Sequence, residues 1–238
     1  MSTMTRVAAA ASIILMPTAV GVGDQLRMRA DTVEASGTGL DRATAELAAV
    51  HAHAGTYAVA SWVFYAAALL TIPMTIALWR LAVARSRRWA LAGAALGALA
   101  AVGQFAHLMG EFAMTQVFAG SADPVAAARI SLEWDQNALS NALIVPYLVG
   151  VLLAPAVQAV ALRRARVVPL WAMIAVLAGS AVMVVGGSSP AGSAAWTVLL
   201  VAGFVPAAAT AVRGGLARGN TVPAAAAPVP AAAAPVPA

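Results

Sequence analysis

The chain has 238 residues, of which 62% are hydrophobic and only 10% are charged. A typical soluble domain has roughly 45–50% apolar and about 25% charged residues, so this composition excludes a soluble enzyme and a disordered chain. The sequence contains no cysteine, which excludes a disulfide scaffold. A pI of about 11.0 is typical of nucleic-acid-binding proteins, but the mean hydropathy of +0.85 leaves too little polar surface for nucleic acid as a partner. An integral membrane protein is the remaining class.

Six apolar stretches are long enough, or nearly so, to cross the hydrocarbon core, which takes about 20 helical residues. They lie at about 7–23, 58–79, 89–109, 142–162, 168–186 and 196–212, and none contains an acid or an arginine. Lipid requires every backbone polar group to be bonded within its own segment, and the alternation typical of a β-barrel is missing. We therefore expect an all-α integral membrane bundle of six transmembrane helices. The first stretch also resembles a signal peptide, whose cleavage would leave five.

The charged residues divide between the two sides of this expected bundle. One side carries ten arginines and no acid: Arg6, Arg80, Arg85, Arg87, Arg88, Arg163, Arg164, Arg166, Arg213 and Arg218. The other side carries four arginines and all nine acids. Because positive residues concentrate in cytoplasmic loops, we expect both termini in the cytoplasm. Tryptophans typical of the membrane interface fall at span ends: Trp79, Trp89, Trp171 and Trp196.

Two segments outside the spans have distinct character. Residues 1–212 are expected to form the transmembrane domain, and residues 213–238 a disordered, Ala/Pro-rich cytoplasmic tail. In the first outer loop, an amphipathic segment from Asp41 to His53 predicts a short interfacial helix, capped by Asp41 and ended by Gly55. The second outer loop, near 121–140, contains Glu133, Trp134, Asp135 and Asn137.

The third span carries the most informative pattern. At 100° per residue, one helical stripe contains four polar residues: Gln104, His107, Glu111 and Thr115. The same stripe continues toward the cytoplasm with small residues: Gly93, Gly97 and Ala100. Small residues let helices approach closely, so we expect this stripe to face the bundle interior.

Three kinds of chemistry are compatible with the stripe. His107 and Glu111 have the spacing of two metal ligands on one helix, and His51, His53 or Asp135 could supply a third. Two helical ligands without a cysteine are a weak signal, so no metal is predicted. Glu111 and His107 are the candidate catalytic residues for acid–base chemistry, cyclisation or isomerisation, on a lipid or isoprenoid-like substrate. The third possibility is binding without chemistry.

For binding, we expect a blind pocket that opens to the outside and holds a lipophilic small molecule or an ion. The candidate ligand-binding residues are Gln104, Tyr65, Asn141, Tyr147, Asp135, Phe105 and Phe112. The two phenylalanines are included because aromatic rings stabilise cations. No phosphate-binding loop, cysteine pair or nucleophile elbow is present, so no cofactor is predicted. A structural or accessory membrane subunit with no pocket of its own is a further alternative, and membrane lipid is an expected partner in every case.

Three short runs carry a resemblance. They are Ala-Ala-Val-His-Ala-His-Ala-Gly at 48–55, Arg-Arg-Trp-Ala-Leu at 87–91, and Leu-Arg-Arg-Ala-Arg-Val-Val-Pro at 162–169. On the basis of these runs, the segment 45–187 resembles small multi-span membrane proteins of unknown function from high-GC actinobacteria. The resemblance implies a multi-pass protein of the bacterial plasma membrane and no particular activity.

Overall fold

The computed structural model describes residues 2–31, 38–186, 189–214 and 216, except for the side chains of His107 and Met109. The predicted tail lies almost wholly outside these residues. The described chain consists of helices and short connections, which confirms the all-α fold. In order, the helices are α1 (Thr3–Asp31), α2 (Leu40–Ala52), α3 (Ala54–Ala82), α4 (Arg87–Gly103), the π-helical turn η1 (Gln104–Leu108), α5 (Met109–Ala119), α6 (Pro124–Gln136), α7 (Ala138–Arg164), α8 (Leu170–Gly186) and α9 (Pro190–Val212).

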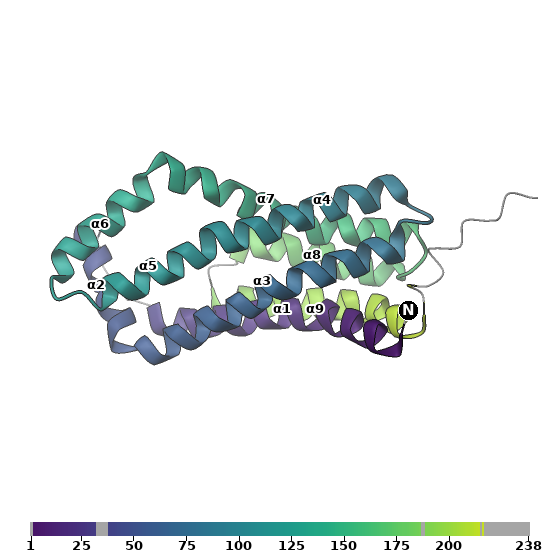
Figure 1. Cartoon of the computed structure of the whole chain (residues 1–238), viewed down its shortest axis with the longest axis horizontal. Coiled ribbons are helices and arrows are strands. Elements are labelled where there is room, and N and C mark those ends of the chain that lie inside the picture. Colours follow the sequence, from purple (N-terminus) through teal and green to yellow (C-terminus); the bar gives the residue numbers. More distant parts are fainter. Residues whose placement is uncertain (1, 32–37, 187–188, 215, 217–238) are drawn as a thin grey trace, which may run out of the picture.

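Six helices form a closed ring of contacts, and they run side by side along the long axis of the molecule (Figure 1). Following the contacts around the ring, α1 packs against α3, α3 against α4, α4 against α7, α7 against α8, α8 against α9, and α9 against α1. Five segments are long and apolar enough to cross a membrane: α1, α3, α4 continued through η1 and α5, α7 and α9. The sixth, α8, is apolar but has only 17 residues. The chain is therefore a helical bundle of the kind that membrane proteins form.

Several helices extend beyond the predicted spans at one end of the bundle. Helices α1 and α3 each have 29 residues, a length of about 43 Å at 1.5 Å per residue, whereas the hydrocarbon core is about 30 Å thick. At this end α1 and α3 both contact α2, α3 also contacts α5, and α6 packs against α2 and α5 (Figure 1). A small core of Ala43, Leu47, Ala127 and Ala128 joins α2 to α6 there.

The predicted interfacial helix is present as α2, with two corrections. Gly39 is the residue before its first turn, and Asp41 lies within that turn without capping it. Gly55 does not end the helix, because α3 begins at Ala54. The second outer loop also contains a helix, α6, whose first turn is capped by Asp123, with the carboxylate accepting from the Ala126 N–H at 3.0 Å. Pro at the first helical position favours a helix start here.

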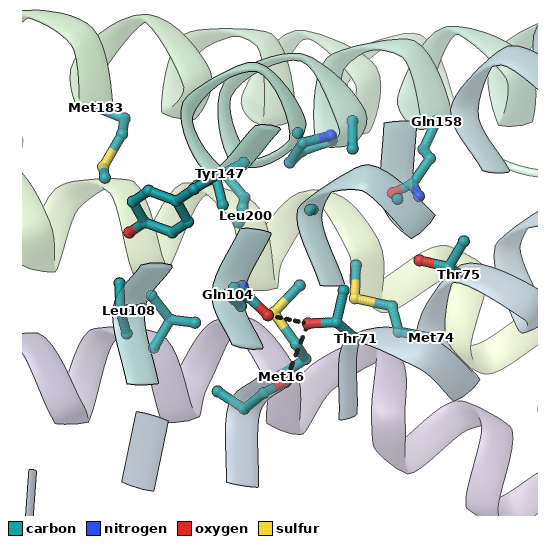
Figure 2. A pocket seen from close by; sticks show the side chains of 18 of the residues that line it. Met16, Thr71, Met74, Thr75, Gln104, Leu108, Tyr147, Gln158, Met183 and Leu200 are labelled. Carbon is teal, nitrogen blue, oxygen red and sulfur yellow. Dashed lines mark hydrogen bonds between the residues drawn. The ribbon is translucent and has the colours of Figure 1, made fainter. Parts of the chain in front are cut away.

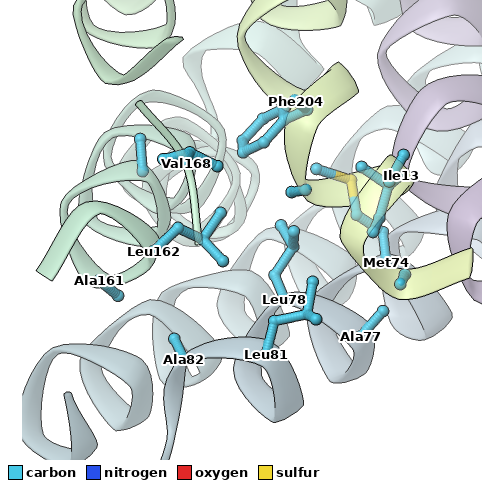
Figure 3. Packing of buried hydrophobic residues seen from close by; sticks show 14 of the residues in the cluster. Ile13, Met74, Ala77, Leu78, Leu81, Ala82, Ala161, Leu162, Val168 and Phe204 are labelled. Carbon is cyan, nitrogen blue, oxygen red and sulfur yellow. The ribbon is translucent and has the colours of Figure 1, made fainter. Parts of the chain in front are cut away.

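The main hydrophobic core lies in the half of the bundle that contains the α3–α4 and α7–α8 turns. Side chains from all six ring helices meet in it, and Figure 3 shows Ile13, Met74, Leu78, Leu162 and Phe204 among them. Each of these five is at most 1% exposed. Trp196 also belongs to this core and is 3% exposed. The structure places this side chain inside the bundle, six residues after α9 begins at Pro190, whereas the sequence places it at a span end. Its depth in the membrane stays a prediction.

Helices α4 and α7 approach each other closely. A Cβ added to Gly150 would overlap the backbone of Ala100, and one added to Gly103 would overlap the backbone of Tyr147. A Cβ added to Gly93 would lie 3.0 Å from Cγ of Gln158. The small residues of the predicted stripe are therefore buried against α7, where close backbone packing stabilises membrane helices.

The charges separate along the bundle as the sequence predicts. One end of the bundle is formed by Arg6, the α3–α4 turn, the α7–α8 turn and Arg213, and we call it the arginine-rich end. Arg6 lies against Gly214, so the N-terminal and C-terminal parts of the described chain meet there. We call the opposite end, with α2, α5 and α6, the acidic end. Which end faces the cytoplasm stays a prediction.

Candidate functional site

A narrow cavity of about 40 Å³ lies at the centre of the ring, and all six ring helices line it (Figure 2). We call it the central cavity. Its wall is mainly apolar, with three flexible methionines, Met16, Met74 and Met183. Methionine adapts its shape to irregular contacts, so this wall can accommodate different apolar groups.

A few polar side chains interrupt the apolar wall. Thr71 on α3 donates a hydrogen bond to Oε1 of Gln104 on η1 at 2.8 Å, and both side chains are buried. Gln158 on α7 donates to the carbonyl of Gly93 at 3.2 Å. These bonds satisfy polar groups that would be costly to bury alone, and they join α3, α4 and α7 around the cavity.

Toward the acidic end, the central cavity leads into a wider space of about 370 Å³, which we call the mouth chamber. Five residues line both spaces: Val20, Phe64, Tyr147, Met183 and Trp196. The chamber adds two charged side chains from α1, Asp24 and Arg27, which are paired at 2.9 Å. An apolar cavity therefore opens beside a partly buried ion pair.

A third space of about 490 Å³, the outer cavity, lies at the acidic end between α1, α2, α3, α5 and α6. Two arginines and four carboxylates line it: Arg27, Arg42, Asp31, Glu46, Glu111 and Asp135. Arg27 also donates to Asp31 at 2.7 Å. The carboxylate of Glu46 accepts a hydrogen bond from Arg42 at 2.7 Å and raises the pKa of that guanidinium. The outer cavity is thus polar and acidic.

An aromatic cluster separates the outer cavity from the central cavity. The Phe112 ring lies between two rings of α3, with its centroid 5.4 Å from Tyr57 and 5.0 Å from Phe64. Tyr57 lines the outer cavity, whereas Phe64 lines the central cavity and the mouth chamber. Phe112 itself is buried and lines none of these spaces. Its role in the described structure is therefore packing between the two sites.

The predicted polar stripe is divided between these two sites. Gln104 lines the central cavity, while Glu111 and Thr115 line the outer cavity. The turn η1 begins at Gln104 and ends before Glu111. Its i→i+5 hydrogen bonds shift the phase of the residues that follow it, relative to an uninterrupted α-helix. His107 belongs to this turn, and its side chain lies outside the described part of the structure.

The other predicted binding residues have separate positions. Tyr147 lines the central cavity and the mouth chamber, and Asp135 lines the outer cavity. Tyr65 is 40% exposed on the outside of the ring, where its ring contacts Phe105 edge-on at 6.0 Å. Asn141 is exposed and donates to the carbonyl of Asp135 at 3.2 Å. The structure therefore does not bring Tyr65, Phe105 and Asn141 to the cavities described here.

Sequence reasoning missed several residues of the site. Trp196 and Met183 line both the central cavity and the mouth chamber, but a single apolar side chain in an apolar span carries no signal of its position. Asp24 and Arg27 had a signal, because charges directly after an apolar stretch and three residues apart can pair within one helix. Among the described residues, no three His, Asp or Glu side chains are arranged to hold a metal ion.

No protein-family model matches the sequence, and neither a characterised protein nor a solved structure is significantly similar to it.

Proposed function

We propose that this chain is a multi-pass protein of the bacterial plasma membrane that binds a lipophilic small molecule at the centre of its helical ring. One observation supports this most directly: an apolar cavity lined by all six ring helices leads into a chamber that contains the Asp24–Arg27 ion pair. Ligand sites are mainly apolar with a few placed polar groups. In our proposal the termini are cytoplasmic and the mouth chamber faces outward, as the arginine distribution favours.

The sizes of the spaces define the kind of ligand. The central cavity, at about 40 Å³, is too small for a drug-sized molecule, since such ligands occupy about 300–1,000 Å³. The mouth chamber, at about 370 Å³, is within that range. We therefore propose a ligand whose polar head occupies the mouth chamber and whose slender alkyl or prenyl chain enters the central cavity between the methionines.

The position of Trp196 provides the test. This side chain lines both spaces and is 3% exposed, so a bromine atom on an alkyl chain in the cavity should quench its fluorescence. The purified chain is titrated in neutral detergent with 12-bromododecanol. The quenching of Trp196 fluorescence is obtained as the difference in quenching between the wild type and Trp196→Phe. We expect saturable quenching of the Trp196 component; a linear, non-saturating decrease would refute the proposal.

Two methionines of α8 give matched variants. Met183 lines the central cavity and the mouth chamber, whereas Met173 packs against the main core and lines neither. Met183→Phe should weaken saturable quenching at least fivefold because the bulkier ring narrows the entrance. Met173→Phe should leave the dissociation constant unchanged. Equal effects of the two variants would mean that the probe binds elsewhere.

A further inference from the structure

The arginine-rich end contains a second hollow, unrelated to the cavities above. It has a volume of about 600 Å³ and is lined by Arg85, Ser86, Arg87, Arg88, Trp89 and Arg164. Five of these residues belong to the α3–α4 turn and the start of α4, and Arg164 belongs to the last turn of α7. We call this space the basic hollow. Four guanidinium groups thus converge where two membrane helices end side by side.

The charge of the basic hollow is not balanced by this chain's own acids. All nine acidic residues of the sequence fall between positions 24 and 135, in segments that run at the acidic end wherever the structure describes them. Arg27 and Arg42 form salt bridges with Asp24, Asp31 and Glu46, all at the acidic end. The acidic side chains that the structure describes therefore lie at the opposite end from the basic hollow.

The backbone adds hydrogen-bond donors to the same place. The first intrahelical bond of α4 is donated by Ala90 to the carbonyl of Ser86, so the preceding N–H groups have no acceptor within the helix. The side chain of Ser86, the residue before the first turn, makes no capping bond. The positive end of the α4 dipole also favours an anion here. Both features support the arginines in favouring a negatively charged group.

The rim of the basic hollow is apolar and faces outward. Trp89 is 40% exposed, and Arg164 lies over its ring with the guanidinium carbon 5.4 Å from the centroid. Leu91, which follows Arg88 of the hollow by three residues and so lies about one helical turn after it, is 48% exposed. Tryptophan at this position is typical of the headgroup level of a bilayer. An acyl chain can therefore run along α4 while its headgroup occupies the hollow.

We infer that the basic hollow binds the phosphate headgroup of an anionic phospholipid, with the acyl chains along the exposed face of α4. Basic pockets between membrane helices are suited to such headgroups. A free phosphate would satisfy the arginines but would leave the exposed Trp89 and Leu91 without a role. This inference is independent of the ligand proposed for the central cavity.

The test uses the full chain in neutral detergent and native mass spectrometry with dioleoyl phosphatidylglycerol or dioleoyl phosphatidylcholine. We expect the anionic lipid to bind at least tenfold more tightly than the zwitterionic one. The hollow variant is Arg87→Gln, Arg88→Gln and Arg164→Gln. Each arginine near an anionic lipid surface is worth about fivefold in affinity, so the triple variant should lose about 100-fold.

The matched control removes the same charge from the same end but outside the hollow: Arg163→Gln, Arg166→Gln and Arg213→Gln. It should change the affinity for phosphatidylglycerol less than threefold. Equal losses in the two triple variants would mean diffuse attraction by the whole end and would overturn the inference. Equal binding of the two lipids would overturn it as well. Displacement of phosphatidylglycerol by millimolar glycerol phosphate would assign the hollow to a soluble phosphate instead.

A second measurement does not depend on the folding of the arginine variants. Phosphatidylglycerol brominated in its acyl chain should quench the fluorescence of Trp89. The Trp89 component is obtained as the difference in quenching between the wild type and Trp89→Phe. Brominated phosphatidylcholine should quench this component less at equal concentration. Equal quenching by the two lipids would overturn the inference.

Discussion

The hydroxyl of Thr71 and the amide oxygen of Gln104 lie 2.8 Å apart in the wall of the central cavity. They belong to α3 and to η1, 33 positions apart in the sequence, so this single bond joins two helices that contact each other inside the ring. Thr71 also lies 3.0 Å from the carbonyl of Ala67. The hydroxyl therefore links its own helix to the turn at which the neighbouring helix changes phase.

Thr71→Val should destabilise the folded bundle by about 1 kcal/mol, the usual range for interhelical side-chain bonds in membranes. Valine keeps the shape but leaves the Gln104 oxygen without its donor. Thr71→Ser keeps the donor and should lose less. The unfolding free energy is measured by steric trapping in bicelles. A serine variant as unstable as the valine variant would show that the methyl group, and not the hydrogen bond, is important.

Gly150→Ala should destabilise the bundle by about 1–3 kcal/mol, the cost typical of overpacking. A Cβ at Gly150 meets the backbone of Ala100, which cannot move without separating α4 from α7. Gly110 is the matched control, because nothing lies within 4 Å of a Cβ added there. Gly110→Ala should be neutral or slightly stabilising, since alanine favours helix more than glycine does. Similar unfolding free energies for both variants would contradict the α4–α7 contact.

Arg27→Gln should destabilise the chain by about 1–2 kcal/mol. Arg27 bonds to both Asp24 and Asp31, and its loss leaves two partly buried carboxylates without their cation. Arg42→Gln is the control. Its pair with Glu46 is mostly exposed, and exposed pairs contribute little, so we expect no measurable change. Thermal unfolding in detergent at several salt concentrations makes the comparison; an Arg42 variant as unstable as the Arg27 variant would refute it.

Single cysteines test the orientation of the bundle, because the chain has no cysteine of its own. Ser121 is exposed at the acidic end and Ala84 is exposed at the arginine-rich end. Intact cells are treated with a membrane-impermeant maleimide. Ser121→Cys should be labelled, and Ala84→Cys should be labelled only after the cells are permeabilised. The reverse pattern would place the arginine-rich end outside.

The sequence predicts the architecture of this chain well because its composition is extreme. Apolar stretches of about 20 residues have few structures open to them in lipid. Each predicted span corresponds to a helix, although α8 begins two residues after the start of 168–186 and the span 89–109 continues from α4 through η1 into α5. Helix α2 is predicted almost residue by residue because Asp41 and the apolar positions after it have a helical period. Helix α6 was missed although Asp123 and Pro124 are a cap and a first-turn proline, since its surroundings contain many short polar residues.

The site is harder to predict than the fold. Gln104 and Glu111 share a stripe on a regular helix, but the structure places them in different cavities. A π-helical turn follows from tertiary packing and has no reliable signature in a single sequence. Tyr65 and Asn141 lie away from the cavities for a different reason. A polar residue near a span end is as suited to the bilayer interface as to a cavity, and the sequence does not distinguish the two environments.

The turn η1 contains one residue more than a regular helix needs between the two sites. A π-helical turn corresponds to one residue inserted into an α-helix, and it absorbs the rotation of about 100° that this residue would otherwise impose on α5. Deleting a single residue within 105–107 would therefore restore a regular helix, with Gln104 still in the central cavity and Glu111 still in the outer cavity. The chain can thus gain or lose one codon at this point without moving either site.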